Sequence, residues 1–232
     1  ILVILLISIQ GFSQNFDYKN YGNLLNKYVS SNGNVNYELL KKNTAELDQV
    51  ISGFESNYPT KSWSKEEILA YYINAYNVYT LKKVVDNYPT KSIKNINNAW
   101  DDKFIILGSK KISLSYIEHN ILRKMNEPRI HFAINCASIS CPNINRVPFY
   151  ADTIENQLEV AAKNFINNTT KNDISRKEVK LSKIFDWYAD DFLKTAWDTA
   201  NLIVEEDIET CRMIGVHGLQ FIEEISKRKN GD

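Results

Sequence analysis

SWSKEEILAYYINAYNVYTLKKVVDNYP (residues 62–89) is the strongest helical segment of this 232-residue chain. Ser64 and Glu67 form a capping-box pattern, in which each side chain satisfies a backbone N–H of the first turn. Pro89 cannot continue the helix and marks its end. Apolar side chains point in nearly every direction around this segment, and a helix that is apolar all round is buried. The sequence therefore predicts a buried central helix around which the rest of the fold is built.

Two asparagines interrupt the apolar surface of this helix. Asn74 and Asn77 are three residues apart, so they share one helix face. A buried carboxamide without partners costs about 1–3 kcal/mol, which means that both side chains need hydrogen-bonding groups. The favoured interpretation is that they hold the backbone of a neighbouring loop, because most buried polar groups are satisfied by backbone. The alternative is that one of them orients a catalytic histidine.

Weaker patterns surround the central helix. Helices are expected at residues 16–58, 113–125 and 150–168, hairpins at 103–114 and from 172, a strand at 129–135, and helix in the tail to 232. The expected fold class is α+β: a helix-rich single domain with a small, mostly antiparallel sheet around the buried central helix. This domain is expected to span residues 15–232.

The N-terminal residues read as an export signal. ILVILLISI (residues 1–9) is apolar except for Ser8, and is too short to span a bilayer. Gly11 and Ser13 suit a cleavage site, so we interpret residues 1–14 as a signal peptide that lacks its own start. A buried strand is the alternative. Export predicts a periplasmic or secreted protein without stable membrane insertion after the signal is removed.

The charge composition argues against two classes of partner. The chain has 28 acidic and 28 basic residues and no long run of either sign. Such a sequence offers no electrostatic footprint for nucleic acid or for an anionic membrane. The expected partner is therefore an unidentified small-molecule or peptide-like ligand.

Residues that can carry chemistry gather in one short region. The chain has three cysteines and three histidines, yet four of these six lie between positions 118 and 141. The members of this group are Glu118, His119, His131, Cys136 and Cys141. Glu118 falls inside the apolar stripe of its helix and needs a hydrogen-bonded or charged partner. The candidate partners are Arg123, Arg129 and a histidine.

One interpretation of this group is a thiol nucleophile. Cys136 would attack an amide or peptide-like bond, His131 or His119 would act as base, and Glu118 would orient that base. Backbone amides of the CASIS loop would hold the oxyanion. A strand through His131 and Cys136 would point them to opposite faces, so either the strand ends between them or His119 is the base.

Two other interpretations remain open. Four residues separate Cys136 from Cys141, which allows a disulfide, and an exported protein favours oxidation. The bridge would then brace a non-catalytic binding domain with a groove lined by tyrosines. The residue types also suit zinc, but the C-x₄-C spacing is weak support for a zinc site. No metal or other cofactor is assigned from the sequence.

Four ordered segments resemble a known family. They are YYINAYNVYTL (71–81), ISLSYIEHNILR (112–123), PRIHFAINCASISCP (128–142) and LSKIFDWYADDF (181–192). These segments are similar to the signature segments of the domain of unknown function 547 (DUF547) family. The resemblance implies a protein that is often exported in bacteria, has no established activity, and has a papain-like or transglutaminase-like thiol-hydrolase ancestry.

The resemblance extends to individual positions. The matching residues are Asn74, Asn77, Glu118, His119, Arg129, His131, Cys136, Ser138, Cys141 and Pro142. It implies that these residues belong to one site, in which Asn74, Asn77, Arg129, Ser138 and Cys141 have supporting roles. The chain departs from the family pattern at its end, LQFIEEISKRKNGD (219–232), where relatives carry a strand of Tyr-Asp-Trp-Ser-Leu-Asn character.

Overall fold

The structure is a computed structural model that describes residues 16–174 and 179–193. The predicted signal peptide, the turn of the second expected hairpin and the predicted helical tail lie outside the described residues. No described helix has both the length and the apolar character that a membrane span needs.

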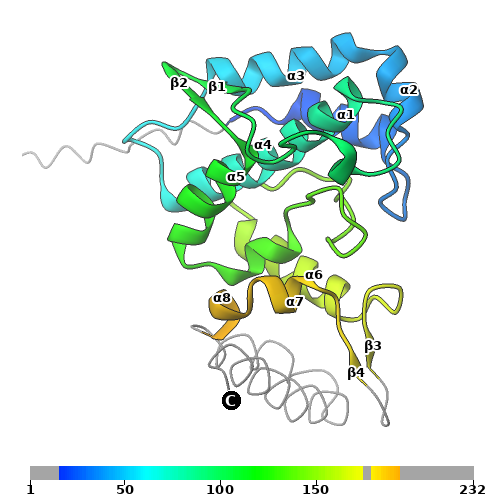
Figure 1. Cartoon of the computed structure of the whole chain (residues 1–232). Coiled ribbons are helices and arrows are strands. Elements are labelled where there is room, and N and C mark those ends of the chain that lie inside the picture. Colours follow the sequence, from blue (N-terminus) through cyan, green and yellow to red (C-terminus); the bar gives the residue numbers. More distant parts are fainter. Residues whose placement is uncertain (1–15, 175–178, 194–232) are drawn as a thin grey trace, which may run out of the picture.

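The described residues form a mostly helical fold. The helices are α1 (Lys19–Tyr28), α2 (Tyr37–Lys42), α3 (Thr44–Ser56), α4 (Lys65–Asp86), α5 (Leu114–Tyr116), α6 (Ile154–Ile166), α7 (Ile184–Trp187) and α8 (Ala189–Leu193). The shorter helical turns are η1 (Ile93–Asn95), η2 (Ile117–Ile121), η3 (Leu122–Met125) and η4 (Pro128–Phe132). The strands are β1 (Ile105–Leu107), β2 (Lys110–Ile112), β3 (Asp173–Ile174) and β4 (Val179–Lys180). Figure 1 shows α1–α3 and α6–α8 at opposite ends of the described part of the chain, with α4 and α5 between them.

The central helix α4 is confirmed. The Ser64 hydroxyl accepts from the Glu67 backbone N–H at 3.1 Å, and the Glu67 carboxylate accepts from the Ser64 N–H at 2.6 Å. Tyr71, Tyr76 and Tyr79 on this helix are all at most 1% exposed. Helices α2, α3 and α6 pack against it, so its apolar circumference is covered from several sides as predicted.

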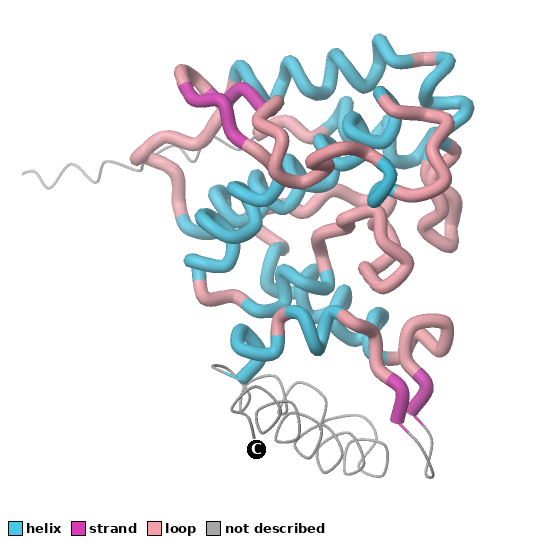
Figure 2. Tube along the Cα trace, in the orientation of Figure 1, coloured by secondary structure: helices cyan, strands magenta, loops and turns pink. Residues whose placement is uncertain are grey.

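The first predicted hairpin is also confirmed. Strands β1 and β2 pair antiparallel, with Ile105 opposite Ile112. Gly108 has φ +61°, and a side chain there would meet the ring of Tyr58 at 2.7 Å, so this turn needs glycine. A second antiparallel pair, β3 with β4, forms a separate sheet. Figure 2 shows these strands as small additions to a helical molecule.

The predicted strand at residues 129–135 is wrong, because the chain forms the helical turn η4 there. Pro128 starts the turn, where its missing N–H is not needed. The Glu127 carboxylate caps it by accepting from the Arg129 N–H at 3.0 Å. These local caps outweigh the alternation of polar and apolar residues. His131 and Cys136 therefore do not have to point to opposite faces, as they would in a strand.

The predicted helix at residues 113–125 forms, but it is not a regular α-helix. The Ser113 hydroxyl caps it by accepting from the Tyr116 N–H at 3.1 Å. Three residues of α5 then lead into a π-helical segment, η2, and a tight turn, η3. Wider π-helical turns are frequent at functional sites, and this one carries Glu118 and His119.

Candidate functional site

Both asparagines of α4 hold loop backbone with paired hydrogen bonds. The Asn74 carboxamide donates to the Phe149 carbonyl at 2.7 Å and accepts from the Phe149 N–H at 3.0 Å. The Asn77 carboxamide donates to the Ala133 carbonyl at 3.0 Å and accepts from the Asn135 N–H at 2.7 Å. Each carboxamide thus donates to and accepts from loop backbone, as the backbone of a neighbouring β-strand would. The interpretation that these residues tie down loops is confirmed.

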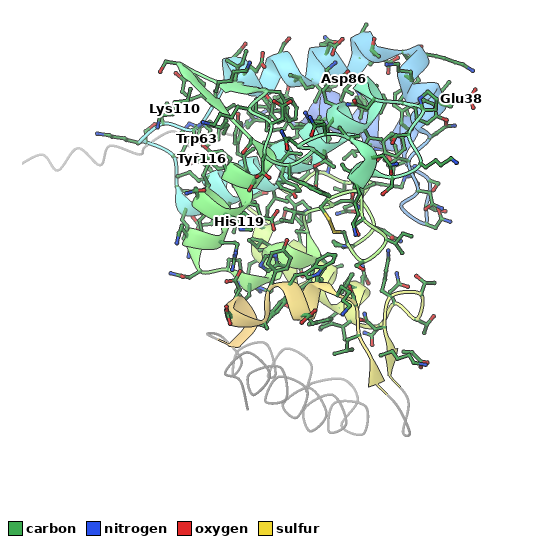
Figure 3. All side chains as sticks on the ribbon, in the orientation of Figure 1. Glu38, Trp63, Asp86, Lys110, Tyr116 and His119 are labelled. Carbon is green, nitrogen blue, oxygen red and sulfur yellow. A yellow bond between two sulfur atoms is a disulfide. The ribbon has the colours of Figure 1, made fainter. Side chains whose placement is uncertain are left out.

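The loop after Asn135 is closed by a disulfide between Cys136 and Cys141, whose Cα atoms are 6.2 Å apart. Figure 3 draws this bond in yellow. The Asn135 side chain also spans the loop, because it donates to the Pro142 carbonyl at 2.6 Å and accepts from the Ala137 N–H at 2.7 Å. Cys136 therefore carries no free thiol in this structure.

Ser138 lies at the turn of this disulfide loop. Its carbonyl accepts from the Cys141 N–H at 3.1 Å, and it is half-buried. Two contacts from outside the loop add to the bracing. The Ser182 hydroxyl donates to the Ser140 carbonyl at 2.7 Å, and the Lys171 ammonium donates to the Ile139 carbonyl at 2.5 Å. Both contacts come from the chain around β3 and β4, which holds the tip of the loop.

Glu118 is a buried carboxylate, 5% exposed, and its partner is a tyrosine. The Tyr76 hydroxyl of α4 donates to Oε2 at 2.9 Å. Burial, followed by the negative charge of Glu118, raises the pKa of Tyr76 well above its usual value. Oε1 of Glu118 has no hydrogen-bond partner among the described residues. Of the candidate partners, Arg129 pairs with Glu127 and Glu155 instead. Among the described residues, no hydrogen bond joins Glu118 to Arg123 or to a histidine.

His131 is fully enclosed and belongs to the same neighbourhood. Its Nε2 lies 2.9 Å from Oδ2 of Asp191 on α8, and its ring stacks on Tyr188 with centroids 3.8 Å apart. Arg123 holds Asp191 with two bonds, of 2.6 and 2.8 Å. Burial lowers the pKa of His131 despite the carboxylates of Asp191 and Glu118, so the imidazole is neutral at neutral pH.

Asp191 stays ionised in this neighbourhood. Burial acts to raise its pKa, but the hydrogen bonds from His131 and Arg123 and the guanidinium charge hold that pKa well below its usual range. Burial and then the charge of Glu118 raise the pKa of Tyr188, which keeps its proton. These residues, Tyr76, Glu118, Arg123, His131, Tyr188 and Asp191, are called the buried polar cluster below.

The remaining site candidates lie at the edges of the cluster. His119 is exposed, and Nδ1 of its ring is 3.0 Å from Nη1 of Arg123 (Figure 3). Arg129 is paired with Glu127 at 2.6 Å and with Glu155 at 2.7 Å, which joins η4 to α6. Among the described residues, no hydrogen bond or ion pair joins the disulfide to His131 or Glu118. The structure places the Glu118 carboxylate and the His131 imidazole in one neighbourhood, but Cys136 contributes no free thiol to it.

Within residues 16–174 and 179–193, no three His, Cys, Asp or Glu side chains are grouped so that they could hold a metal ion. Tyr76, Tyr188 and Asp191 belong to the polar cluster but were not predicted as site residues. Tyr188 and Asp191 do occur in one of the four family-like segments, and that was the available signal.

A cleft of about 560 Å³ lies beside the disulfide loop and is called the asparagine cleft. Phenylalanines 132, 149 and 165 and several smaller apolar residues line it. Its polar lining consists of Ser31 and of seven carboxamides, namely Asn32, Asn143, Asn145, Asn156, Gln157, Asn164 and Asn168. Arg146 is the one charged residue among its described lining residues. Ala133 and Phe149, which the α4 asparagines hold, belong to this lining, so those two hydrogen-bonded pairs position the walls of the cleft.

One wall of the cleft is a regular face of α6. Asn156, Val160 and Asn164 follow one another at intervals of four residues, and all three are exposed. No described residue hydrogen-bonds to the side chains of Asn156 or Asn164, so both are available to a ligand. These positions were not predicted as site residues; the signal for them is the four-residue spacing of Asn156, Val160 and Asn164 on an amphipathic helix.

The chain was compared with known proteins. Residues 60–166 match the family described as "Protein of unknown function, DUF547". Among curated proteins, a methylthioribose-1-phosphate isomerase from Desulfatibacillum aliphaticivorans is 55% identical over 42 residues, which cover 18% of this chain. That match spans only 11% of the relative's length. No solved structure matches the chain.

Proposed function

We propose a binding function for this chain, which carries a DUF547 family domain over residues 60–166: it holds an extended, uncharged stretch of peptide in the asparagine cleft. The observation that carries the proposal is the chemistry of the lining. A carboxamide both donates and accepts, as a peptide group does, and two carboxamides of the lining, Asn156 and Asn164, have no hydrogen bond to another described residue. Val160, which is exposed between them, can contact apolar side chains of the peptide, while the two carboxamides bond to its backbone.

The spacing of asparagines on α6 supports an extended ligand. A helix rises about 1.5 Å per residue, so Asn156 and Asn164 stand about 12 Å apart along the axis. An extended chain advances about 3.3 Å per residue, and every second residue turns its N–H and C=O to the same side. Four residues of such a peptide cover about 13 Å. Asn156 and Asn164 can therefore each meet a peptide group, with Val160 between them.

The bracing of the cleft supports binding by a preformed surface. Asn74 and Asn77 fix two lining segments from the buried helix α4, and the disulfide fixes the loop that leads into Pro142. A surface that is already ordered loses less conformational entropy when a ligand binds. The disulfide thus has a structural role in the proposal.

The proposal includes export. Disulfides form and persist in oxidising compartments and are rare in the cytosol. The Cys136–Cys141 bridge therefore supports the periplasmic or secreted location expected from residues 1–14. The thiol-hydrolase hypothesis needs Cys136 as a thiolate, and a bridged sulfur cannot serve as one. The papain-like or transglutaminase-like ancestry rests on the sequence resemblance alone.

Thiol labelling separates the binding role from the thiol-hydrolase role. The protein is unfolded without reductant, treated with iodoacetamide, digested and analysed by mass spectrometry. Only Cys211 should be modified before reduction, and all three cysteines after it. Modification of Cys136 in a folded, unreduced sample, at a pH where an ordinary cysteine is still protonated, would restore the nucleophile hypothesis.

Peptide arrays test the binding function directly. The folded protein is applied to immobilised uncharged peptides of about eight residues, and the affinity of the best peptide is measured in solution. Replacing Asn156 and Asn164 together by leucine should weaken binding about tenfold or more, because several hydrogen bonds to the peptide are lost. Asn167→Leu is the matched control, since Asn167 follows α6 but does not line the cleft, and it should leave the affinity within about twofold. Equal affinities of the double variant and the unaltered protein would refute the proposal.

A further inference from the structure

Arg146 stands where the asparagine cleft meets a second cleft. The second cleft also has a volume of about 560 Å³, and its aromatic lining residues are Phe16, Tyr18, Trp63 and Tyr150. Arg146 and Val147 line both clefts. The guanidinium is therefore located at one end of the asparagine cleft and not in its middle.

Most of the hydrogen-bonding capacity of Arg146 is unused within the described structure. One donor, Nη2, reaches the Asn26 carbonyl at 3.3 Å. Nε is buried and has no partner among the described residues. No ion pair joins Arg146 to any described carboxylate. Because Nε is enclosed by protein atoms, a ligand in the cleft can reach the guanidinium through its Nη1 and Nη2 edge.

The group that fits Arg146 is a carboxylate. A guanidinium presents its N–H donors in a planar fork that matches the two oxygens of a carboxylate. Arg146 is also the one charge in the described lining of the asparagine cleft, so a ligand that is otherwise uncharged gains from an anionic group at this end only. Beyond Arg146, the second cleft is lined by three carboxylates, Asp17, Glu67 and Asp152, and by one ammonium group, that of Lys19, so the excess of negative charge disfavours an anion further along.

We propose that Arg146 binds the carboxy-terminal carboxylate of the peptide held in the asparagine cleft. This inference rests on the proposed peptide-binding function and adds a direction to it. The chain of the ligand ends at Arg146, and its preceding residues run along α6 past Val160. A peptide terminus suits this position because the cation stands at an end of the cleft and is followed by repelling charges.

The test uses the best array peptide in two forms, with a free C-terminal carboxylate and as the C-terminal amide. The free acid should bind about tenfold to a hundredfold more tightly than the amide. In the Arg146→Gln variant this ratio should fall to about one. Arg146→Lys keeps the charge but loses the fork, so the ratio should lie between these values. Lys19→Gln removes a cation that lines only the second cleft and should leave the ratio unchanged.

A third peptide distinguishes the two sources of a carboxylate. It is the amide form with glutamate as its last residue. If it binds as tightly as the free acid, the carboxylate is taken from a side chain and the proposal of a terminus is overturned. Equal binding of the free acid and the plain amide also overturns it, while the peptide-binding function stands. If no peptide binds in either form, both proposals fail together.

Discussion

Replacing Asn77 by alanine is expected to lower the free energy of unfolding by about 3 kcal/mol. The Asn77 side chain is 2% exposed and makes two hydrogen bonds, to the Ala133 carbonyl and from the Asn135 N–H. Alanine removes both bonds and leaves the buried carbonyl of Ala133 without this donor. Each buried group without its partner costs about 1–3 kcal/mol. Urea unfolding followed by circular dichroism measures the change.

The matched control is Asn164→Ala, which makes the same substitution in another helix. Asn164 is exposed on α6, so its replacement should change stability by no more than about 0.5 kcal/mol. Asn77→Ala should also weaken peptide binding, because Ala133 lines the asparagine cleft. An Asn77→Ala protein as stable as the Asn164→Ala protein would mean that the loop at Ala133 is held by other contacts.

Replacing Asp191 by alanine is expected to cost about 3 kcal/mol of stability, because it breaks the buried polar cluster. Asp191 accepts two bonds from Arg123 and one from His131, and its side chain is 15% exposed. Its loss leaves the Arg123 guanidinium without its carboxylate and the enclosed His131 without its hydrogen bond. The Arg123–Asp191 pair is partly buried, so the larger share of the cost falls on His131, whose fully enclosed ring loses its hydrogen-bond partner.

A double-mutant cycle tests this explanation. Arg123→Ala combined with Asp191→Ala should be more stable than the sum of the two single losses predicts, by about 1 kcal/mol or more. Asp186→Ala serves as control, because Asp186 forms an exposed pair with Lys183 at 3.4 Å on the same short segment. That substitution should cost less than about 1 kcal/mol. Strict additivity of the two single losses would show that Arg123 and Asp191 do not depend on each other.

Most of the local structure could be predicted because its signals are local. The capping box at Ser64, the apolar circumference of α4 and the glycine turn at Gly108 each depend on residues a few positions apart. The strand predicted at residues 129–135 was wrong because two local signals competed there. The cap from Glu127 with Pro128 favoured a helical turn over the alternating pattern.

The candidate site could be predicted only in part. The sequence required that Asn74 and Asn77 have partners, and it grouped Glu118, His131 and the two cysteines. It did not say that Tyr76 would hold Glu118 or that Asp191, 60 positions from His131, would hold the imidazole. Such partners depend on how distant segments meet, which no local spacing reveals.

The sequence by itself determined the buried helix, its ends and the need of its two asparagines for hydrogen bonds. These follow from helix periodicity, from capping chemistry and from the cost of an unsatisfied carboxamide. The tertiary structure alone decided which loops the asparagines hold, that Cys136 is joined to Cys141, and that carboxamides from α6 and three loops face one cleft. The reason is physical: short-range spacing sets the conformation of a segment, whereas a site depends on the paths by which separate segments are brought together.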